Sequence, residues 1–465
     1  MTTFHPRRPD HRRSPLSRRR LLGGTAAALG AAAAGPTLAA CGSSGAAGGK
    51  VELDYWLWDA TQLPGYSEAI DLFMRENPDI DVRITQMGWD DYWTKLTAGF
   101  VAEAGPDVFT DHLGRYPEML ALGVIVPLDD FAPIAEIPED RFQPGLQDLW
   151  TGQDGKRYGL PKDYDTIALM YDTAALEEAG VSPEDLASLD WNPADGGSFE
   201  QMLLHLTVDT NGKRGDEDGF DATSIATYGL GADAGIDYTG QTSWSTFAFA
   251  TGWAFTDKDT WGTRFRYDEP EFQQTMDWYF GLVDKGILPP FGMFGDSSPA
   301  QSQLQSRKAA LALAGSWMIG TYANLEGVSL GIAPLPSGPI GHPMSMFNGL
   351  GDSISAQSEH PEEAARLVAF LGSDASQEII GRRGVVFPAT DAGTAAATAA
   401  YEEKGLDVSP YTDRVDNGET GLYPLVENAA QIASIMQPAF DDLWMRKTDA
   451  SSFTAYNEKV NALFS

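Results

Sequence analysis

The side chains in this sequence that could do chemistry are chiefly carboxylates, aromatic rings and a single thiol. Sixty-six acidic residues stand against 32 basic ones, and there are 12 tryptophans and 16 tyrosines. Neighbouring acids could serve as the two carboxylates of a glycosidase, and such pairs occur at Asp90-Asp91, Asp129-Asp130 and Asp441-Asp442. A chain this rich in acids produces pairs by chance, so the pairs alone do not indicate an enzyme.

Motifs for nucleophilic, phosphate or metal chemistry are missing from the sequence. Four histidines follow the first forty residues, at positions 112, 205, 342 and 360, and their spacing matches no metal motif. There is no Gly-x-Ser-x-Gly, phosphate loop or dinucleotide fingerprint in this part of the chain. These absences argue against an enzyme and predict neither a cofactor nor a metal centre. We keep a secreted glycoside-active enzyme as the alternative to a protein without catalytic activity.

The only cysteine, Cys41, ends the segment Leu38-Ala39-Ala40-Cys41, so the chain can form no internal disulfide. This segment resembles a bacterial lipobox, in which the cysteine is lipidated and becomes residue one. Seven arginines precede an uncharged stretch from Leu21 to Ala34, which is the layout of a secretory signal and too short to span a bilayer. The cluster Arg18-Arg19-Arg20 resembles a twin-arginine export signal, with the general secretory route as the alternative.

We therefore expect residues 1–40 to be a signal peptide and residues 41–50, rich in glycine, alanine and serine, to be a lipid-anchored flexible tether. The protein is then exported and held through lipidated Cys41 on the outer face of the cell membrane. Removing the signal takes the net charge from −34 to −40, because residues 1–40 contain seven arginines and one aspartate. A surface of this charge repels nucleic acid and stands off from anionic lipid, so we expect no nucleic-acid partner.

Alternating strands and helices must position the polar and aromatic side chains. Apolar residues at every second position predict strands at 51–57 and 80–84, and Asp107-Val108-Phe109 predicts a third. Helical spacing predicts a helix ending before Asn77-Pro78, and a second one capped by Asp90 or Asp91 with Trp93, Leu96, Phe100 and Val101 inward. Two more are expected from Pro270 to Gly286 and from Pro361. This alternation predicts an α/β fold with a largely parallel sheet, and the length predicts two lobes.

Several short segments follow one another along the chain in a characteristic order. They lie at residues 73–82, 89–96, 105–109, 122–130, 158–172, 310–317 and 354–365. Examples are Gly105-Pro106-Asp107-Val108-Phe109 and Tyr158-Gly159-Leu160-Pro161. In this order they resemble the extracellular solute-binding proteins of ABC importers, in particular the carbohydrate-binding group that includes maltose-binding protein. The resemblance covers nearly the whole chain.

The resemblance implies a two-lobed periplasmic-binding-protein-like fold of type II, with the ligand cleft between lobes joined by about three hinge crossings. By analogy, the N-terminal lobe takes residues 51–165 plus 353–384, and the C-terminal lobe takes 166–350 plus 387–465. The implied function is a substrate-binding lipoprotein, monomeric, that captures a sugar or oligosaccharide and delivers it to the transmembrane subunits of an ABC permease. A receptor for a non-sugar solute is the alternative.

Candidate ligand contacts follow the carboxyl ends of strands, where clefts form in parallel α/β sheets. This rule selects Trp58, Asp59, Asp111, Arg115 and Asp165. An aromatic ring can hold the apolar face of a sugar while acids accept from its hydroxyls. A hinge or cap acid is the alternative for Asp165, and a surface salt bridge is the alternative for Arg115.

The resemblance adds contacts in the second half of the chain. Trp317, in Ala314-Gly315-Ser316-Trp317, matches a stacking platform of the family. Asn348 could place its amide in the cleft, and Gly349 would allow close backbone approach. Trp244 lies in a polar stretch and is expected to be exposed, although core packing is the usual place of a tryptophan. Asp111 stands where maltose-binding protein has an aromatic residue, so the specific sugar does not carry over.

A segment at residues 209–219 has oxygen-bearing side chains at alternate positions, as a calcium loop does. Lys213 and Arg214 occupy positions where acids are expected, and the terminal bidentate glutamate is missing. The sequence therefore favours an ordinary solvated loop here over a calcium site.

Overall fold

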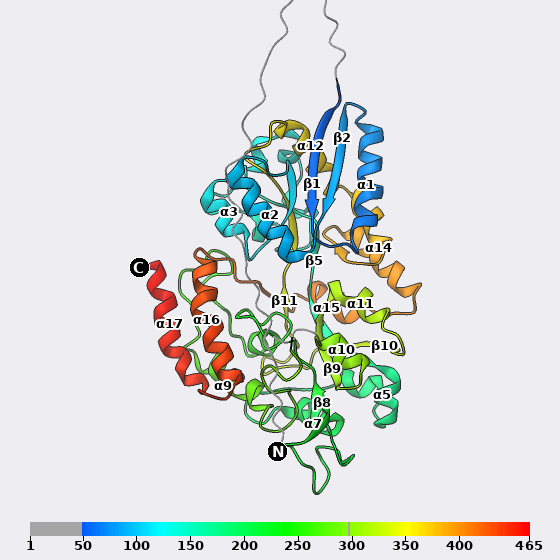
Figure 1. Cartoon of the computed structure of the whole chain (residues 1–465), viewed down its shortest axis with the longest axis vertical. Coiled ribbons are helices and arrows are strands. Elements are labelled where there is room, and N and C mark those ends of the chain that lie inside the picture. The colour runs from blue at the N-terminus through cyan, green and yellow to red at the C-terminus, as the bar shows by residue number, and fades with distance from the viewer. Residues whose placement is uncertain (1–48, 234, 296–297) are drawn as a thin grey trace, which may run out of the picture. The chain divides into compact units, whose positions relative to one another are not determined.

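The structure, a computed structural model, describes residues 49–233, 235–295 and 298–465. The predicted signal peptide, the predicted lipidation site Cys41 and all but the last two residues of the tether lie outside the described residues. The described part forms two lobes, each built on one five-stranded sheet (Figure 1). The predicted two-lobed α/β fold is therefore confirmed.

The first sheet has the strand order β2-β1-β3-β12-β4. Its strands are β1 Val51–Leu57, β2 Ile80–Gln86, β3 Val108–His112, β4 Leu160–Pro161 and β12 Leu350–Ile354. Strand β1 is parallel to β2 and β3, whereas β12 is antiparallel to β3 and β4. The predicted strands are confirmed, and the predicted parallel arrangement holds for the first three of them. It fails at β12 because this strand returns from the other lobe instead of following a crossover helix.

The second sheet is mixed, with the order β10-β6-β9-β8-β7. Its strands are β6 Ile167–Asp172, β7 Val208–Asp209, β8 Ile225–Leu230, β9 Ala309–Gly315 and β10 Leu330–Ala333. Only β8 and β9 pair in parallel; the other pairs are antiparallel. The largely parallel sheet expected from the sequence is wrong for this lobe. Strands β6 and β9 are buried along their whole length, which explains their continuous apolar runs.

The hinge between the sheets consists of short strands that bond to one another. They are β5 Asp163–Tyr164 with β13 Phe387–Pro388, and β11 Ser345–Phe347 with β14 Thr420–Leu422. The backbone N–H of Asp165 donates to the Asn348 carbonyl at 2.8 Å, and that of Lys162 donates to the Leu350 carbonyl at 2.9 Å. The N–H of Ala389 donates back to the Lys162 carbonyl at 3.2 Å. Three distant parts of the chain are therefore joined by backbone hydrogen bonds at one place.

Helices cover the sheets, and α1 and α2 lie on opposite sides of β1 and β2 (Figure 1). In the first third of the chain they are α1 Leu63–Glu76, α2 Trp89–Ala102, α3 Tyr116–Leu122 and α4 Ala132–Ala135. Next come α5 Thr173–Glu178, α6 Pro183–Ala187, α7 Gly197–Leu206, α8 Ser245–Phe249, α9 Pro270–Gly281, α10 Ala300–Gln305 and α11 Ile319–Ala323. The last are α12 Pro361–Leu371, α13 Asp374–Gly381, α14 Asp391–Glu402, α15 Ser409–Asp416, α16 Ala429–Trp444 and α17 Phe453–Asn461.

The predicted division of the chain between the lobes stays a prediction. Helix α14 packs against α13, which in turn contacts α1 beside the first sheet. The prediction assigned residues from 387 onward to the other lobe, so α14 is the element where the contacts and the predicted boundary differ.

The helix predictions differ from the structure at the ends. Helix α1 ends at Glu76, before Asn77, and helix α12 begins at Pro361, and both bounds are as predicted. Helix α2 is preceded by Gly88 at its N-cap, and Asp90 and Asp91 lie in its first turn, so the predicted caps are wrong. Val101 is 84% exposed rather than inward, because it lies one residue before the helix ends. Helix α9 ends at Gly281, five residues before the predicted stop.

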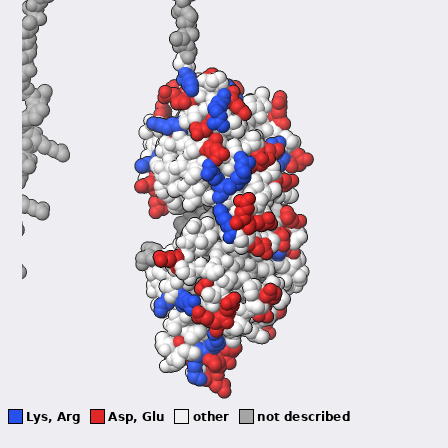
Figure 2. All heavy atoms as spheres, turned by 90° about the vertical axis from the view of Figure 1, so that its right-hand side faces the viewer, with Lys and Arg blue, Asp and Glu red and all other residues white. Residues whose placement is uncertain are grey.

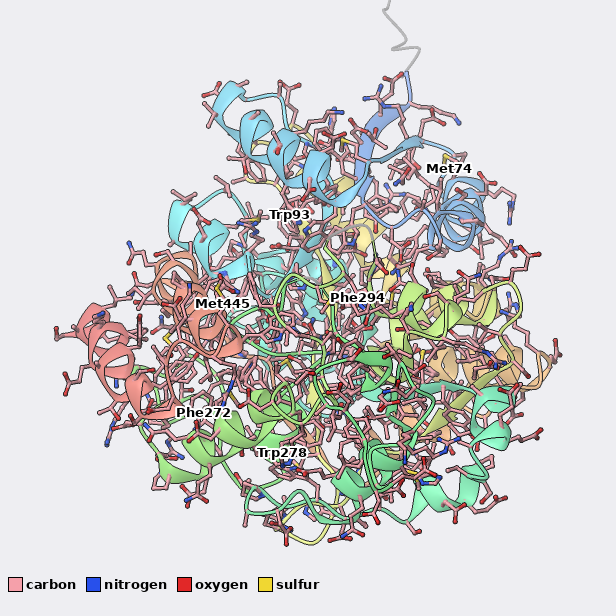
Figure 3. The ribbon with its side chains drawn as sticks, turned by 60° about the horizontal axis from the view of Figure 1, so that its bottom comes forward. Met74, Trp93, Phe272, Trp278, Phe294 and Met445 are labelled. Carbon is pink, nitrogen blue, oxygen red and sulfur yellow. The ribbon has the colours of Figure 1, made fainter. Side chains whose placement is uncertain are left out.

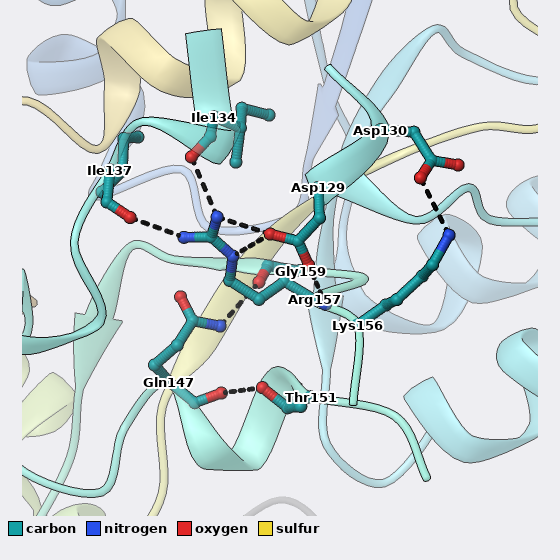
Figure 4. A network of polar contacts seen from close by, with 9 residues as sticks. All are labelled: Asp129, Asp130, Ile134, Ile137, Gln147, Thr151, Lys156, Arg157 and Gly159. Carbon is teal, nitrogen blue, oxygen red and sulfur yellow. Dashed lines mark hydrogen bonds and ion pairs between the residues drawn. The ribbon is translucent and has the colours of Figure 1, made fainter. Parts of the chain in front are cut away.

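The buried side chain of Arg157 holds the segment that leads into β4 (Figure 4). Its Nε donates to Asp129 Oδ1 at 2.7 Å, and its two terminal nitrogens donate to the carbonyls of Ile137 and Ile134 at 3.0 Å. A buried guanidinium is tolerated only when it is paired and its donors are used. This network therefore fixes the first lobe immediately before the chain enters the hinge.

The lobes also meet away from the hinge, at Trp261. Its indole Nε1 donates to the Thr151 carbonyl at 2.8 Å, and its ring lies 5.9 Å from that of Tyr116. Two residues after Thr151, the side-chain Nε2 of Gln153 donates to Glu427 Oε1 at 2.6 Å. These contacts tie the loops after α3 to the second lobe.

Charged side chains of both signs are interspersed over both lobes on the face that Figure 2 displays. The excess of acid seen in the sequence is therefore not gathered into one patch on this face. Within the described ranges, we find no helix with the length and apolar character that a membrane crossing requires.

Trp244 belongs to the aromatic core of the second lobe, and its predicted exposure is wrong. Its side chain is 0% exposed and stacks on Phe440 at 5.1 Å, with Phe272 at 5.4 Å edge-on. Phe272 and Trp278, labelled in Figure 3, both belong to α9 of this lobe. The polar residues before Trp244 form a turn at Gly240, whose φ of 61° lets the indole fold inward. The turn is polar in sequence, yet Gly240 and Ser243 are buried together with the tryptophan.

Replacing Trp244 by Ala should remove a large buried ring and leave a cavity. We expect a loss of about 3–5 kcal/mol in the free energy of unfolding, measured by urea denaturation followed by circular dichroism. Trp89→Ala is the matched control, since Trp89 is 44% exposed and loses less packing. Equal losses for the two variants would contradict the core assignment of Trp244.

Candidate ligand-binding cavity

A cavity of about 260 Å³ lies at the hinge and is lined from both lobes. The lining residues are Trp58, Asp59, Gln62, Trp89, His112, Asp163, Asp165, Gln241, Trp317, Asn348, Leu350 and Val386. A larger hollow of about 670 Å³ is formed by loops near residues 145–152, 249–261 and 420–424, and none of the predicted ligand residues lines it. We take the smaller cavity as the candidate site, because tryptophans and buried polar groups from separate segments converge there.

The first lobe contributes an aromatic wall from three consecutive strand ends. Trp58 follows β1, Trp89 opens α2 after β2, and His112 ends β3. The rings of Trp58 and Trp89 lie edge to face at 5.0 Å, and Trp89 lies 5.5 Å from His112. Parallel strands bring their carboxyl ends to one edge of the sheet, which is why these rings meet.

Trp317 faces this wall from the second lobe, in the turn after β9. Its ring folds back over Gly315: a Cβ on residue 315 would lie 1.8 Å from Cζ3 of the indole. A side chain at position 315 would therefore displace the ring. Gly315 must therefore lack a side chain if the Trp317 ring is to occupy this position.

Asp59, Asp163 and Asp165 bring three carboxyl groups to the cavity. Asp59 lies in a half-buried turn, where its Oδ1 accepts from the N–H and hydroxyl of Thr61 at 2.7 and 2.6 Å. Asp165 is buried on the hinge and accepts from the Ser316 hydroxyl at 3.2 Å. Burial raises the pKa of Asp165, and the negative charge of Asp163 raises it further. Burial likewise raises the pKa of Asp163, partly opposed by Lys162.

Three buried polar atoms of the lining residues have no hydrogen-bond partner within the described part of the chain. They are Gln62 Oε1, Asp163 Oδ2 and Gln241 Nε2. Buried polar atoms without partners are rare and costly in folded proteins. Two acceptors and one donor of the lining residues are therefore left without hydrogen bonds, covered by protein atoms, within the described part of the chain.

Asn348 and Gly349 serve the hinge as well as the cavity. Asn348 lines the cavity, is 2% exposed, and accepts from the Gly349 N–H through its own Oδ1 at 2.8 Å. Gly349 is not among the lining residues; a Cβ there would lie 2.6 Å from the Asp163 carbonyl. The close backbone approach that the structure shows at Gly349 is made to the hinge strand, and its approach to a ligand stays a prediction.

Asp111, Arg115 and Trp244 do not line the cavity. Asp111 is fully buried in β3, where one oxygen accepts from the His112 N–H at 2.7 Å and the other has no partner. Burial raises the pKa of Asp111 to about 8 and lowers that of His112 to about 4. The guanidinium of Arg115 lies over the Trp93 ring at 5.6 Å, on the outer side of the aromatic wall. Arg115 therefore lies outside the cavity lining, and among the described residues it makes no salt bridge, which was the alternative.

Sequence reasoning missed several lining residues, including Gln62, His112, Asp163 and Gln241. Asp163 could have been found, because it lies two positions before Asp165 on an extended segment and alternate residues share one face. Gln62 precedes α1 in the loop after β1, where the strand-end rule also applies. No signal marks Gln241, which reaches the cavity from a long loop.

The segment at 209–219 is an ordinary loop in its contacts. The Asp209 carboxylate accepts from the backbone N–H groups of Asn211, Lys213 and Asp221, and the Lys213 ammonium bonds the Asp218 carbonyl. In the ranges that the structure describes, no group of three or more histidine, cysteine, aspartate or glutamate side chains is placed to hold a metal ion.

Comparison with known proteins identifies a family over most of the chain. A profile described as bacterial extracellular solute-binding protein matches residues 68–405. The arabinooligosaccharide-binding protein of Bacillus subtilis is 23% identical over 349 residues, which cover 72% of each chain.

Solved structures show the same fold. The ABC substrate-binding protein Lmo0181 from Listeria monocytogenes, in complex with cycloalternan, superposes with a TM-score of 0.72 at 16% identity, covering 89% of this chain and 99% of that one. UgpB from Mycobacterium tuberculosis, in complex with glycerophosphocholine, gives a TM-score of 0.70 at 18% identity, covering 90% and 98%. At these identities the likeness establishes the fold alone.

The buried carboxyl of Asp111 should make stability depend on pH. Because its folded pKa is raised to about 8 from 3.8, the proton stabilises the fold fully below the unfolded pKa, and this contribution is lost as pH rises through 8. Asp111→Asn keeps the acceptor for the His112 N–H but cannot ionise. We expect its melting temperature to exceed that of the wild type by about 2 °C or more at pH 8.5, and this difference to be much smaller at pH 5, where most of the contribution of the proton is still present. Parallel melting curves at both pH values would contradict the raised pKa.

Proposed function

The chain belongs to the bacterial extracellular solute-binding proteins, and from this premise we propose that it captures a sugar or oligosaccharide in the hinge cavity and delivers it to an ABC importer. Its relatives and structural neighbours are binding proteins, among them the arabinooligosaccharide-binding protein and Lmo0181. We infer the class of ligand from these relatives, and we infer the residues that contact the ligand from the cavity of this chain.

One observation carries the proposal: tryptophan rings from both lobes enclose polar atoms that lack partners. Trp58 and Trp317 offer apolar faces to the C–H side of a sugar ring. Gln62 Oε1 and Asp163 Oδ2 can accept from sugar hydroxyls, and Gln241 Nε2 can donate to them. A saccharide supplies both kinds of surface on one small molecule, whereas an apolar ligand would leave the polar atoms unpaired.

Ligand contacts to both lobes would couple binding to closure. Trp58 belongs to the first lobe and Trp317 to the second, so a ligand that touches both binds the closed form better than the open one. Asp165 and Asn348 lie where the chain passes between the lobes, so their contacts would form in the same step. A permease could then distinguish loaded from empty protein by the arrangement of the lobes.

The remaining features of the proposal concern location. A lipidated Cys41 would hold the protein at the outer face of the cell membrane, as a monomer beside its permease, after export directed by residues 1–40. Lipid attachment through two acyl chains gives stable anchoring, whereas a single chain does not. We further propose the twin-arginine route for export, on the basis of the arginine cluster at residues 18–20.

Replacing Trp317 by Ala should weaken saccharide binding by about 30-fold or more, because a stacking face is lost from the ligand. Gly315→Ala should do the same without removing the ring, by displacing it. A saccharide that binds is first found by thermal-shift screening, and affinities are then measured by titration calorimetry. Met318→Ala is the matched control, since Met318 is equally half-buried and does not line the cavity.

The outcomes separate the parts of this proposal. Unchanged affinity in Trp317→Ala would remove the stacking role. Binding of polyols or peptides, with no saccharide binding, would replace the sugar by another solute and leave the transport role in place.

Replacing Cys41 by Ser should release the protein from the membrane, because the lipid-bearing sulfur is lost. We expect more than nine-tenths of the wild type, and about one-tenth or less of the variant, in the membrane fraction after cell breakage and centrifugation. Ser43→Ala is the control and should stay with the membrane. Membrane retention of Cys41→Ser would argue against lipid attachment at this residue.

A further inference from the structure

The cavity has an excess of acidic groups that its own lining does not balance. Asp59, Asp163 and Asp165 line it, and among the residues that the structure describes no lysine or arginine does. A neutral saccharide needs acceptors but not three carboxyl groups on one small surface. A charge imbalance of this kind inside a cavity indicates that the ligand carries the opposite, positive charge.

The cations nearest to these acids are used elsewhere or are absent. Lys162 is 2% exposed and turned away from the cavity: its ammonium donates to the Thr110 hydroxyl at 3.0 Å and lies 4.1 Å over the Tyr66 ring. It also acts on Asp352, a buried acid that does not line the cavity and that accepts from the Tyr55 hydroxyl at 2.8 Å. His112, on the opposite wall, is neutral at pH 7 because burial lowers its pKa to about 4. Around the hinge there is therefore one lysine, Lys162, for the four acids Asp59, Asp163, Asp165 and Asp352.

Asp163 is the acid whose surroundings point most directly to a ligand. It is 1% exposed and lines the cavity; its Oδ1 accepts from the Leu350 N–H at 3.0 Å, and its Oδ2 has no partner within the described part of the chain. A carboxylate oxygen is a strong acceptor, and its best donor is a charged one. A ligand ammonium would supply the missing donor and the missing charge together.

We propose that the cavity selects saccharides that carry a protonated amine, whose charge is balanced by the carboxyl groups of Asp59, Asp163 and Asp165. This inference rests on the proposed function and narrows its ligand class from sugars to amino-substituted sugars. The tryptophan faces keep their role toward the ring of the sugar, and Gln241 and Gln62 keep theirs toward its hydroxyls.

Affinity for an amine-bearing saccharide should change with pH in one direction. Burial raises the pKa of Asp163 to about 6 and also raises that of Asp165, so in the empty cavity these groups keep their protons to higher pH than free carboxyl groups do. A cationic ligand favours the ionised carboxylates, so its binding releases a proton and strengthens as pH rises. A neutral sugar that accepts hydrogen bonds from protonated acids would instead bind more weakly as pH rises.

The test compares saccharides that differ only in one group. Titration calorimetry on the full protein uses matched pairs in which one ring hydroxyl is replaced by an amine, such as glucose with glucosamine, galactose with galactosamine, and cellobiose with its glucosamine counterpart. We expect the amine to bind about tenfold tighter at low salt, with the advantage reduced by added salt. Between about pH 5 and pH 7, where the amine stays charged, its affinity should rise with proton release into the buffer.

Asparagine variants assign the effect to the acids. Asp163→Asn keeps the acceptor for the Leu350 N–H and Asp59→Asn keeps the acceptor for Thr61, so each removes charge with little change of structure. Each should abolish most of the preference for the amine. Asp172→Asn is the control: it neutralises a buried acid that caps α5 away from the cavity and should leave the preference intact.

The possible results distinguish this inference from the function on which it rests. Equal binding of the amine and the hydroxyl form, or affinity for the amine that falls as pH rises, would overturn the amine preference and leave saccharide binding standing. A preference that survives in both Asp163→Asn and Asp59→Asn would overturn its assignment to these acids. Failure of every saccharide to bind would overturn both proposals.

Discussion

The structure depends most on the backbone pairing of the segment from Lys162 to Ile167 with its return strands. This segment leaves the first sheet and enters the second, and its N–H and carbonyl groups bond to residues near 348–350 and 387–389. Side chains on an extended segment alternate, so Asp163 and Asp165 share a face, and both line the cavity. The same pairing that connects the lobes therefore sets the position of the acids between them.

The hinge position carries an energetic cost that a ligand would recover. Gln62, Asp163 and Gln241 each keep one buried polar atom without a partner within the described part of the chain, which destabilises the empty protein. Hydrophobic packing elsewhere offsets this cost, including the aromatic core around Trp244. A solute that supplied these three hydrogen bonds would recover part of the cost, which favours tight and selective capture.

Sequence patterns predicted the elements well and the cavity in part. The first strands and helices followed from their apolar spacing, because each buries one face against the same core. Trp58, Asp59, Asp165, Trp317 and Asn348 were placed in the cavity by strand ends and by family resemblance. Asp111 and Arg115 were selected by the same strand-end rule, which gives the edge of the sheet but not which way a side chain turns. Trp244 and Gln241 depended on how a long loop folds, and no local pattern encodes that.

The fold-back of Trp317 over Gly315 has a consequence for how such a site can change over evolution. A ring that contacts a ligand can be exchanged for another ring, and binding is then retuned. Position 315 has no such freedom, since a single added methyl would collide with the indole. A residue that has no side chain and does not line the cavity therefore restricts this site, and a survey limited to lining residues would overlook it.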